Sequence, residues 1–460
     1  MSRTTTQNIL PRRLSSMLAV LFWIVVWQLA SMAVANEFIL AGPLDALRAL
    51  ARLVPTAAFW GQIAFSFLRI AAGTAVAYAL VIALAAAAHR WALVRTLAAP
   101  ALSAIKSTPV ACVVVVLLIW FGSRNVSAIA VFLMALPGIY FPVLKGLDEL
   151  DPQMEELFCL YRADARTRLL AHVVPGVMPY LVAASATVLP MSWKAGVAAE
   201  LIGVPDGSIG ERIYQAKLLL ETADLFAWTI VVVLVAWVFE RAVLSALNAC
   251  WPAAGRWAAL HQDRRTAATP TGATIVARQL RAGHAGTAAC RAVDFEVAPG
   301  EILCLMGSSG AGKTTMLSTI TGLLSPVSGN LSIPDETRFA AVFQEARLVD
   351  DLTPEENVRL FAPRDRNARA MLAELLPQDA LGSPVRELSG GQRRRVELVR
   401  ALAADADVVL LDEPFTGLDG KTHQEALAFV TRHLDGRPLI ISTHDKQDAL
   451  ALGGKILAIS

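Results

Sequence analysis

Long apolar runs separated by short polar segments dominate the first half of the sequence, from Met17 to about Ala249. A helix needs about 20 apolar residues to cross the hydrocarbon core of a bilayer, and a soluble core could not accommodate so many uninterrupted runs. The pattern therefore predicts an all-α membrane domain with six spans. The predicted spans are Met17–Ala35, Ile70–Ala88, Ser107–Ser123, Asn125–Leu144, Val173–Trp193 and Leu225–Phe239, the last of which extends through Arg241 to Leu247.

The first run also has features of a signal peptide. Arg3, Arg12 and Arg13 precede it, and Ala33–Ala35 has the A-x-A form of a cleavage site. The run is longer than the usual apolar core of a signal peptide and five more spans follow, so we expect it to stay as a span, with cleavage as the alternative. Six spans place both termini in the cytoplasm, and the Lys and Arg residues in the loops after the second and fourth spans agree with that orientation.

The hydrophobic pattern changes near residue 265, where short apolar runs begin to alternate with helical stretches. Glu301–Met306, Val408–Leu411 and Leu439–Ser442 are typical of buried strands. The alternation predicts an α/β domain with a largely parallel sheet. We therefore divide the chain into a membrane domain at residues 1–252, a polar linker at 253–273 and an α/β domain at 274–460.

The composition agrees with this division. The chain is 55% hydrophobic and 17% charged, whereas soluble domains usually have about 45–50% and about 25%. The formal net charge of +2 and the lack of a dense Lys/Arg tract give no indication of nucleic-acid binding.

A glycine-rich segment follows the first strand of the α/β domain and precedes a helix. It fits the pattern G-x-x-x-x-G-K-[ST], whose glycines let backbone N–H groups surround phosphates. The helix N-terminus favours the same negative charge. We expect Lys313 to reach the β- and γ-phosphates of ATP and Thr314 to bind Mg²⁺. The residues of this phosphate loop are Gly307, Ser308, Ser309, Gly310, Ala311, Gly312, Lys313, Thr314 and Thr315.

Two acidic residues follow the apolar strand Val408–Leu411 directly. We expect Asp412 to hold Mg²⁺ through water and Glu413 to polarise the attacking water. An acidic helix cap is the alternative, and the run that follows, Pro-Phe-Thr-Gly-Leu-Asp at Pro414–Asp419, argues against it.

The segment Leu388–Gln392 reads Leu-Ser-Gly-Gly-Gln, the signature of ATP-binding-cassette ATPases, and the chain from about Ile275 to Ser460 resembles that family. The resemblance implies that Ser389, Gly390, Gly391 and Gln392 meet ATP held by the phosphate loop of a second copy of the chain, so that the active form is a homodimer. It further implies that Gln344 senses Mg²⁺ and water, that Asp419 lies at the dimer interface, and that His444 contacts the γ-phosphate.

Two positions depart from that family. His284 stands about where the family has an aromatic residue that stacks on adenine, and imidazole offers less stacking area than tyrosine. The segment between Gln344 and Leu388 is short for the helical subdomain of such ATPases, and no C-terminal regulatory domain is expected after His444.

The loop Asp148–Pro175, between the fourth and fifth predicted spans, resembles the coupling segment of bacterial binding-protein-dependent permeases. Glu156 and Pro175 match its pattern, whereas Arg162 replaces a glycine. The resemblance implies a short helix that docks on an ATPase, and an unspecialised amphipathic loop is the alternative. In addition, Lys106–Gly122, Trp193–Glu200 and Phe343–Leu348 resemble the nitrate/sulfonate/taurine group of importers.

That group implies import of a small anion, delivered by a periplasmic binding protein, across the bacterial inner membrane. Trp193 and Lys194, at the end of the fifth predicted span, are candidates for the solute path because ionisable groups at membrane depth tend to line pathways. An exporter and a membrane ATPase without a solute are the alternatives. The short loops argue against the exporter, and the coupling loop argues against the ATPase without a solute.

Overall fold

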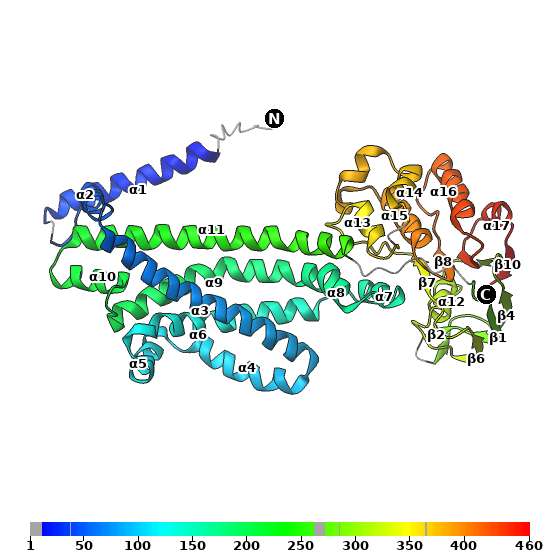
Figure 1. Ribbon diagram of the computed structural model, residues 1–460, viewed down its shortest axis with the longest axis horizontal. Coiled ribbons are helices and arrows are strands. Elements are labelled where there is room, and N and C mark those ends of the chain that lie inside the picture. Colours follow the sequence, from blue (N-terminus) through cyan, green and yellow to red (C-terminus); the bar gives the residue numbers. More distant parts are fainter. Residues whose placement is uncertain (1–11, 37, 262–271, 285, 364–365) are drawn as a thin grey trace, which may run out of the picture. The chain divides into compact units, whose positions relative to one another are not determined.

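The computed structural model describes all residues except 1–11, 37, 262–271, 285 and 364–365. The chain forms two compact units (Figure 1). The first unit comprises the chain up to Asp148 together with Pro179–Asn248, and the second comprises Glu149–Met178 together with Ala249–Ser460. The first unit is helical, and the second contains all the strands of the described residues. The expectation of an all-α membrane domain followed by an α/β domain is confirmed.

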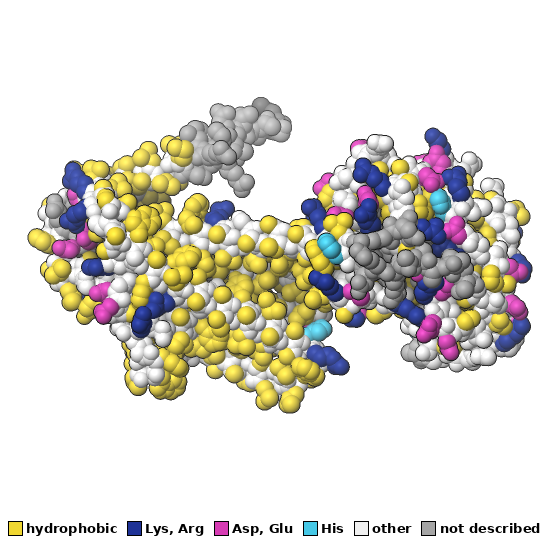
Figure 2. Space-filling model, viewed as in Figure 1, with side chains coloured by type: hydrophobic (Ala, Val, Ile, Leu, Met, Phe, Trp, Pro, Cys, Tyr) yellow, Lys and Arg dark blue, Asp and Glu magenta, His cyan; other side chains and the backbone are white. Residues whose placement is uncertain are grey.

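Long apolar helices build the first unit, and hydrophobic side chains cover much of its visible face (Figure 2). Among the described residues, five helical segments are long and apolar enough to cross a membrane, and a sixth span results if one bent helix pair counts as a span. The helices that lie wholly or partly in this unit are α1 (Arg12–Val34), α2 (Pro43–Leu53), α3 (Ala57–Arg90), α4 (Ala92–Ser107), α5 (Val110–Phe121), α6 (Val126–Asp148), α9 (Val174–Gly203), α10 (Ile209–Leu218) and α11 (Thr222–Leu260).

The third predicted span, Ser107–Ser123, differs most from the structure. The apolar helix α5 begins only at Val110, after Thr108 and Pro109, and it meets α4 at an angle of 105°. Proline restricts the residue before it to extended conformations and lacks an N–H for the helical ladder. Thr108 is accordingly extended, with φ −80° and ψ 128°. The span is therefore a bent pair of helices.

Small residues let the helices of the first unit approach closely, as is common in membrane bundles. A Cβ on Gly73 in α3 would lie 2.3 Å from the carbonyl oxygen of Ala128 in α6, and one on Gly196 in α9 would lie 2.6 Å from Ile70 in α3. Ile70 and Trp193 are fully buried in the cluster that joins α3 to α9. Replacing either glycine would thus push two spans apart.

Three sheets of the described residues form the α/β part of the second unit, and the smallest is the hairpin of β2 and β3. Five parallel strands lie in the order β10-β5-β9-β8-β7, and three antiparallel strands lie in the order β4-β1-β6. The strands are β1 (Ile275–Arg281), β2 (Gly283–His284), β3 (Thr287–Ala288), β4 (Val293–Val297), β5 (Ile302–Met306), β6 (Ser328–Ser332), β7 (Phe339–Val342), β8 (Val408–Asp412), β9 (Leu439–Ser442) and β10 (Lys455–Ala458).

The three strands expected from sequence are the three central strands of the parallel sheet, β5, β9 and β8. They read as unbroken apolar runs because helices cover both of their faces. The helices are α12 (Lys313–Ile320), α13 (Pro354–Arg359), α14 (Ala368–Leu375), α15 (Gly390–Ala403), α16 (Gly420–His433) and α17 (Lys446–Leu452).

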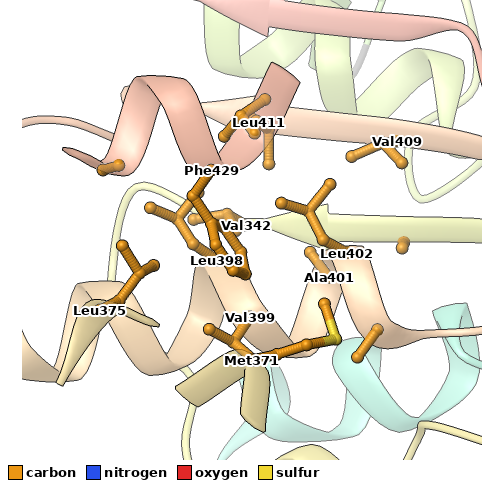
Figure 3. Close-up of a cluster of buried hydrophobic side chains, with 14 of the residues drawn as sticks. Val342, Met371, Leu375, Leu398, Val399, Ala401, Leu402, Val409, Leu411 and Phe429 are labelled. Atoms are coloured by element: carbon orange, nitrogen blue, oxygen red, sulfur yellow. The ribbon is translucent and has the colours of Figure 1, made fainter. Parts of the chain in front are cut away.

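One buried cluster joins α15 to this sheet. Figure 3 shows Leu398 and Leu402 of α15 in the same cluster as Val342 of β7 and Val409 of β8, with Phe429 of α16 beside them. All five side chains are at most 2% exposed. One face of α15 is thereby fixed against the end of β7, which leads into Gln344.

Chain segments from the membrane half complete the second unit. The short helices α7 (Pro152–Leu160) and α8 (Ala165–Arg168) lie in Glu149–Met178, and α11 continues to Leu260, so the predicted linker 253–273 begins within a helix. The helix continues because its buried face packs on the α/β domain: Ala258 and Ala259 join a buried cluster, and Gly255 lies against Leu352. Residues 262–271 of that linker lie outside the described residues.

Candidate functional site

The phosphate loop, Gly307–Thr315, connects β5 to α12 and needs glycine at three positions. Gly310 and Gly312 have φ angles of +82° and +93°, in the left-handed region that favours glycine. A Cβ on Gly307 would lie 2.4 Å from the carbonyl oxygen of Ile459, and one on Gly312 would lie 2.9 Å from that of Ala289. The loop therefore keeps its backbone N–H groups around a concave space at the start of α12, which suits a phosphate chain.

Lys313 closes this loop on itself. Its ammonium group donates to the carbonyl oxygens of Gly307 (3.0 Å) and Ser308 (3.2 Å), and it lies 3.7 Å from a carboxylate oxygen of Glu413. The side chain is only 7% exposed. A charge held this deeply needs partners of opposite charge, so the ammonium group is suited to bind the phosphates that the sequence predicted for it.

The two predicted acids lie where β8 ends, next to β9. Asp412 is buried and accepts a hydrogen bond from the hydroxyl of Ser442, whose oxygen also accepts from the N–H of Glu413 at 2.9 Å. Glu413 itself has a φ angle of +46°. A non-glycine residue in this left-handed region carries strain that the surrounding structure must hold. Here, Ser442 fixes the strained turn that directs Glu413 toward Lys313.

Oxygen atoms suited to a hard cation meet beside the phosphate loop. The hydroxyl of Thr314 lies 3.5 Å from the side-chain oxygen of Gln344, and both side chains are exposed. Asp412 is the carboxylate at the end of the neighbouring strand. A hydroxyl, an amide oxygen and a carboxylate match the ligands that Mg²⁺ prefers. The residues present therefore fit the metal that the sequence predicted at Thr314, Gln344 and Asp412.

The signature residues and Asp419 lie at the N-terminal ends of two helices, α15 and α16. Ser389 caps α15 in a capping box with Gln392, at 3.3 Å and 2.9 Å, with Gly390 and Gly391 between them. Asp419 caps α16, and the backbone N–H of Thr422 lowers the pKa of its carboxyl. At the start of α15, Ser389 and Gly390 are exposed, and Gly391 and Gln392 are half-buried.

His444 is exposed, in the loop that follows β9. The loop is anchored by its neighbour Thr443, whose hydroxyl donates to Asp448 at 2.7 Å. Asp448 also lies 2.7 Å from a ring nitrogen of His423 in α16. His284 is exposed too, at the end of the hairpin strand β2, where it pairs with Thr287 of β3.

The chain at residues 152–162, which we call the α7 segment, lies on residues 343–348, which we call the Gln344 loop. Glu156 pairs with the guanidinium of Arg347 at 2.9 Å, and the same guanidinium donates to the carbonyl oxygen of Gln153 at 3.1 Å. The amide of Gln153 donates to Glu345 at 2.6 Å. A helix from the membrane half thus binds the residues that directly follow Gln344.

A second set of contacts fixes the chain just after α7. The hydroxyl of Tyr161 accepts from the N–H of Ala341 and donates to its carbonyl oxygen, both at 3.1 Å. Since β7 is an edge strand, these two backbone groups face away from β8 and would otherwise lack a partner in the sheet. Burial raises the pKa of Tyr161. The phenol therefore stays protonated and can donate.

Arg162 and Pro175 have separate roles in the segment. Arg162 has a φ angle of +49°, the left-handed conformation that glycine adopts most easily, and its guanidinium donates to the carbonyl oxygen of Thr337 at 3.3 Å. Pro175 is the second residue of α9, which continues without a break from the π-helix Leu169–Val173. The backbone shape that a glycine would give is therefore kept, although the residue is different.

The two candidates for a solute path do not lie together. Trp193 is 1% exposed inside the first unit, whereas Lys194 is exposed. The helix α9 runs nine residues past Lys194 to Gly203, so the side chain is not at the end of its span. The buried acid in this unit is Glu200, which accepts from the hydroxyl of Ser66 at 2.7 Å and from the N–H of Gly210 at 3.3 Å.

Sequence reasoning missed Tyr161, Arg347 and the buried Glu397 of α15. Arg347 carried a signal, because it follows Gln344 by three residues in a segment already singled out. Tyr161 and Ala341 are 180 positions apart, and no local pattern connects them.

Comparisons with known proteins match both halves of the chain. Residues 290–416 match the family model for ABC transporters, and residues 79–242 match the model for the inner membrane component of binding-protein-dependent transport systems. An aliphatic sulfonates import ATP-binding protein of Nocardia farcinica is 41% identical over 197 residues, which cover 42% of this chain and 78% of the relative. A taurine import ATP-binding protein of Roseobacter denitrificans is 35% identical over 186 residues, which cover 36% and 69%. The structure of a dimeric bacterial ABC transporter cassette has a TM-score of 0.36 and 27% identity, covering 40% of this chain and 94% of the other.

Proposed function

Because the chain belongs to the ABC transporter family, with a permease domain and an ATPase domain on one polypeptide, we propose that it imports a small anionic solute at the expense of ATP. It is an ATPase coupled to transport across a membrane. The proposal concerns the direction of transport and the solute. A sulfonate such as taurine is the solute class supported by the relatives, which are named for the import of aliphatic sulfonates and taurine.

The contact between α7 and the Gln344 loop supports the coupling of ATP hydrolysis to transport, whereas the names of the relatives support the direction and the solute. A transporter has to pass the effect of ATP binding from the phosphate loop to the membrane helices. In this chain, Gln344 lies beside Thr314, and its neighbours Glu345 and Arg347 bind Gln153 and Glu156 of α7. Three residues of one loop therefore connect the proposed Mg²⁺ site to the segment that joins α6 to α9.

The chain's own residues divide the ATPase reaction among them. Lys313 and the N–H groups of the phosphate loop hold the β- and γ-phosphates, and Thr314, Gln344 and Asp412 hold Mg²⁺, which neutralises charge on the phosphates. Glu413 accepts a proton from the attacking water. His444 supports the γ-phosphate from the other side. His284 stacks on adenine with a smaller area than tyrosine would supply.

Two copies of the chain complete two sites. The residues at the start of α15, Ser389, Gly390, Gly391 and Gln392, present N–H groups and a hydroxyl to the ATP of a second copy, and Asp419 lies where the copies meet. A helix N-terminus favours the negative charge of the γ-phosphate. The homodimer also supplies two membrane domains, which enclose the path between them, with Lys194 as the candidate contact for an anion.

Uptake into proteoliposomes tests the proposal. We expect the purified full chain, supplied with a periplasmic sulfonate-binding protein, to accumulate radiolabelled taurine or ethanesulfonate when MgATP is present on the side of the ATPase domain. Thiamine, a cation, is the control solute. ATP hydrolysis without accumulation of either sulfonate, while another solute class is taken up, would refute the solute assignment, and loss of preloaded taurine would refute the direction.

A further inference from the structure

The helix that begins with the signature residues, α15, also binds the backbone of the Gln344 loop. Arg394 donates to the carbonyl oxygens of Phe343 and Gln344, the second at 2.5 Å. Glu397 accepts from the N–H of Arg347 at 2.8 Å, and Arg400 donates to the carbonyl oxygen of the same residue. Three side chains of one helix thus satisfy four backbone groups of residues 343–347.

These three side chains also bind one another, at helical spacings of three residues. Glu397 lies 3.1 Å from Arg394 and 3.6 Å from Arg400. Arg394 is 9% exposed, and the other two are fully buried. Burial raises the pKa of Glu397 even though both arginines oppose the shift. We name Arg394, Glu397 and Arg400 the α15 triad.

Buried ionic groups of this kind contribute little net stability, because desolvation offsets most of their attraction. Their geometry, however, is demanding, since each charge requires its partners at fixed places. The α15 triad therefore defines where residues 343–347 lie relative to the signature helix. A merely apolar contact would allow the loop to shift along the helix.

The side chains of Glu345 and Arg347, in the same loop, bind the membrane-derived helix α7 instead. The guanidinium of Arg347 lies 3.5 Å from the ring centre of Phe343 and pairs with Glu156 of α7, while its own N–H and C=O are held by the triad. Arg400 further lies 5.7 Å from the ring of Tyr161. Arg347 is thus bound by α15 through its backbone and by α7 through its side chain.

We propose that Glu397 is a positioning residue for coupling: through Arg394 and Arg400 it holds residues 343–347 to the signature helix, so that α7 moves together with Ser389–Gln392. The inference rests on the proposed function, since it concerns the same ATPase and the same α7 segment. Within one chain, it connects Ser389–Gln392, which contact the ATP of the second copy, to α7, which leads into the membrane domain of the same chain.

Hydrogen exchange of the full chain in lipid nanodiscs tests the inference, with MgATP as the probe and Glu413→Gln as the parent, so that ATP is not consumed. In the parent, MgATP should slow exchange in three peptides: 307–320 at the ATP site, 343–350 in the loop and 152–162 in α7. In Glu397→Gln, the first peptide should respond as before and the α7 response should be lost. Exchange in the peptide 343–350 should be up to about 10-fold faster, because the N–H of Arg347 then bonds to a neutral amide oxygen in place of a charged carboxylate.

Two further variants keep the test decisive. Arg394→Gln combined with Glu397→Gln removes both charges at once, which avoids leaving one buried charge unpaired, and should give the same loss at α7. Asp407→Asn is the matched control, because it also neutralises a buried acid paired with an arginine, Arg338, near the start of β7 and β8. It should leave the α7 response intact.

An α7 response that persists in either triad variant would overturn the inference. Loss of the ATP-site response along with the α7 response would overturn it as well, because the triad would then have only a structural role. If the parent itself shows no MgATP response at residues 307–320, the proposed ATPase site fails, and the inference fails with it. The pattern across the three peptides distinguishes these results.

Discussion

Replacing Tyr161 with phenylalanine removes one oxygen atom from the contact between the α7 segment and β7. The ring keeps its place, because its centre lies 4.6 Å from that of Phe361 and the side chain packs against both buried clusters of the second unit. The change leaves the N–H and the carbonyl oxygen of Ala341 without their partner. It therefore measures what the hydroxyl contributes, separately from the packing.

The expected cost follows from the two orphaned groups. Leaving a buried donor or acceptor unsatisfied costs about 1–3 kcal/mol, and Ala341 is only 3% exposed. Two such groups are left unsatisfied, but the variant no longer has to desolvate the hydroxyl of Tyr161, which lowers the cost. The net free-energy cost of Tyr161→Phe is therefore about 2–4 kcal/mol. At about 1.4 kcal/mol per factor of ten, the N–H of Ala341 should exchange about 30- to 700-fold faster if the local opening reaction controls its exchange.

Hydrogen exchange of the peptide containing Ala341 is the direct measurement, made on the full chain in nanodiscs. Tyr78→Phe is the matched control, because it removes the same atom from a hydroxyl that contacts Ser185 in the first unit at 2.6 Å. Tyr161→Phe should accelerate exchange at Ala341, and Tyr78→Phe should not. Exchange within threefold of the unmodified chain in Tyr161→Phe would refute the reasoning, since the hydroxyl would then not hold this strand edge.

Three other changes probe separate parts of the molecule. Glu413→Gln should lower steady-state phosphate release about 10²–10⁴-fold while bound ATP is retained, and normal release would contradict the role of the carboxylate. Arg162→Gly should be more stable than Arg162→Ala by about 1 kcal/mol in denaturant unfolding, because only alanine keeps the left-handed strain; equal stability would show that φ is relaxed there. Glu200→Ala should lower the melting temperature of the chain in detergent by several degrees, because the hydroxyl of Ser66 and the N–H of Gly210 lose a buried acceptor. Glu221→Ala replaces an exposed acid and should change the melting temperature little.

The parts of the fold that were predictable depend on short stretches of sequence. β5, β8 and β9 are unbroken apolar runs because both faces of a central parallel strand are buried. The phosphate loop was predictable for a similar reason. Gly310 and Gly312 occupy backbone conformations that few other residues adopt, so the spacing of the glycines itself encodes the shape of the loop.

Two features of the structure could not be predicted from the length of the apolar runs alone. The bend between α4 and α5 had a signal, because Thr108-Pro109 lies inside the predicted span and proline disfavours helix at the preceding residue. The sequence contains no signal for the burial of Glu397. Arg393–Arg395 and Glu397 give the start of α15 the composition of an exposed helix. Of these side chains, Arg394 and Glu397 are buried because the backbone of residues 343–347, some 50 positions earlier, lies against them.

Arg162 shows why a weak sequence match can still mark a preserved structure. The coupling pattern has glycine at this position, and the departure lowered the value of the motif as a sequence signal. Yet the φ angle of +49° is one that glycine would adopt freely. The strain of about 1–2 kcal/mol at a non-glycine residue is offset in part by the hydrogen bond from its guanidinium to Thr337. Since the α7 segment and the ATPase domain are covalently joined, their docking is intramolecular and has a high effective concentration. A strained residue that makes a direct contact is therefore tolerated here more easily than it would be between separate chains.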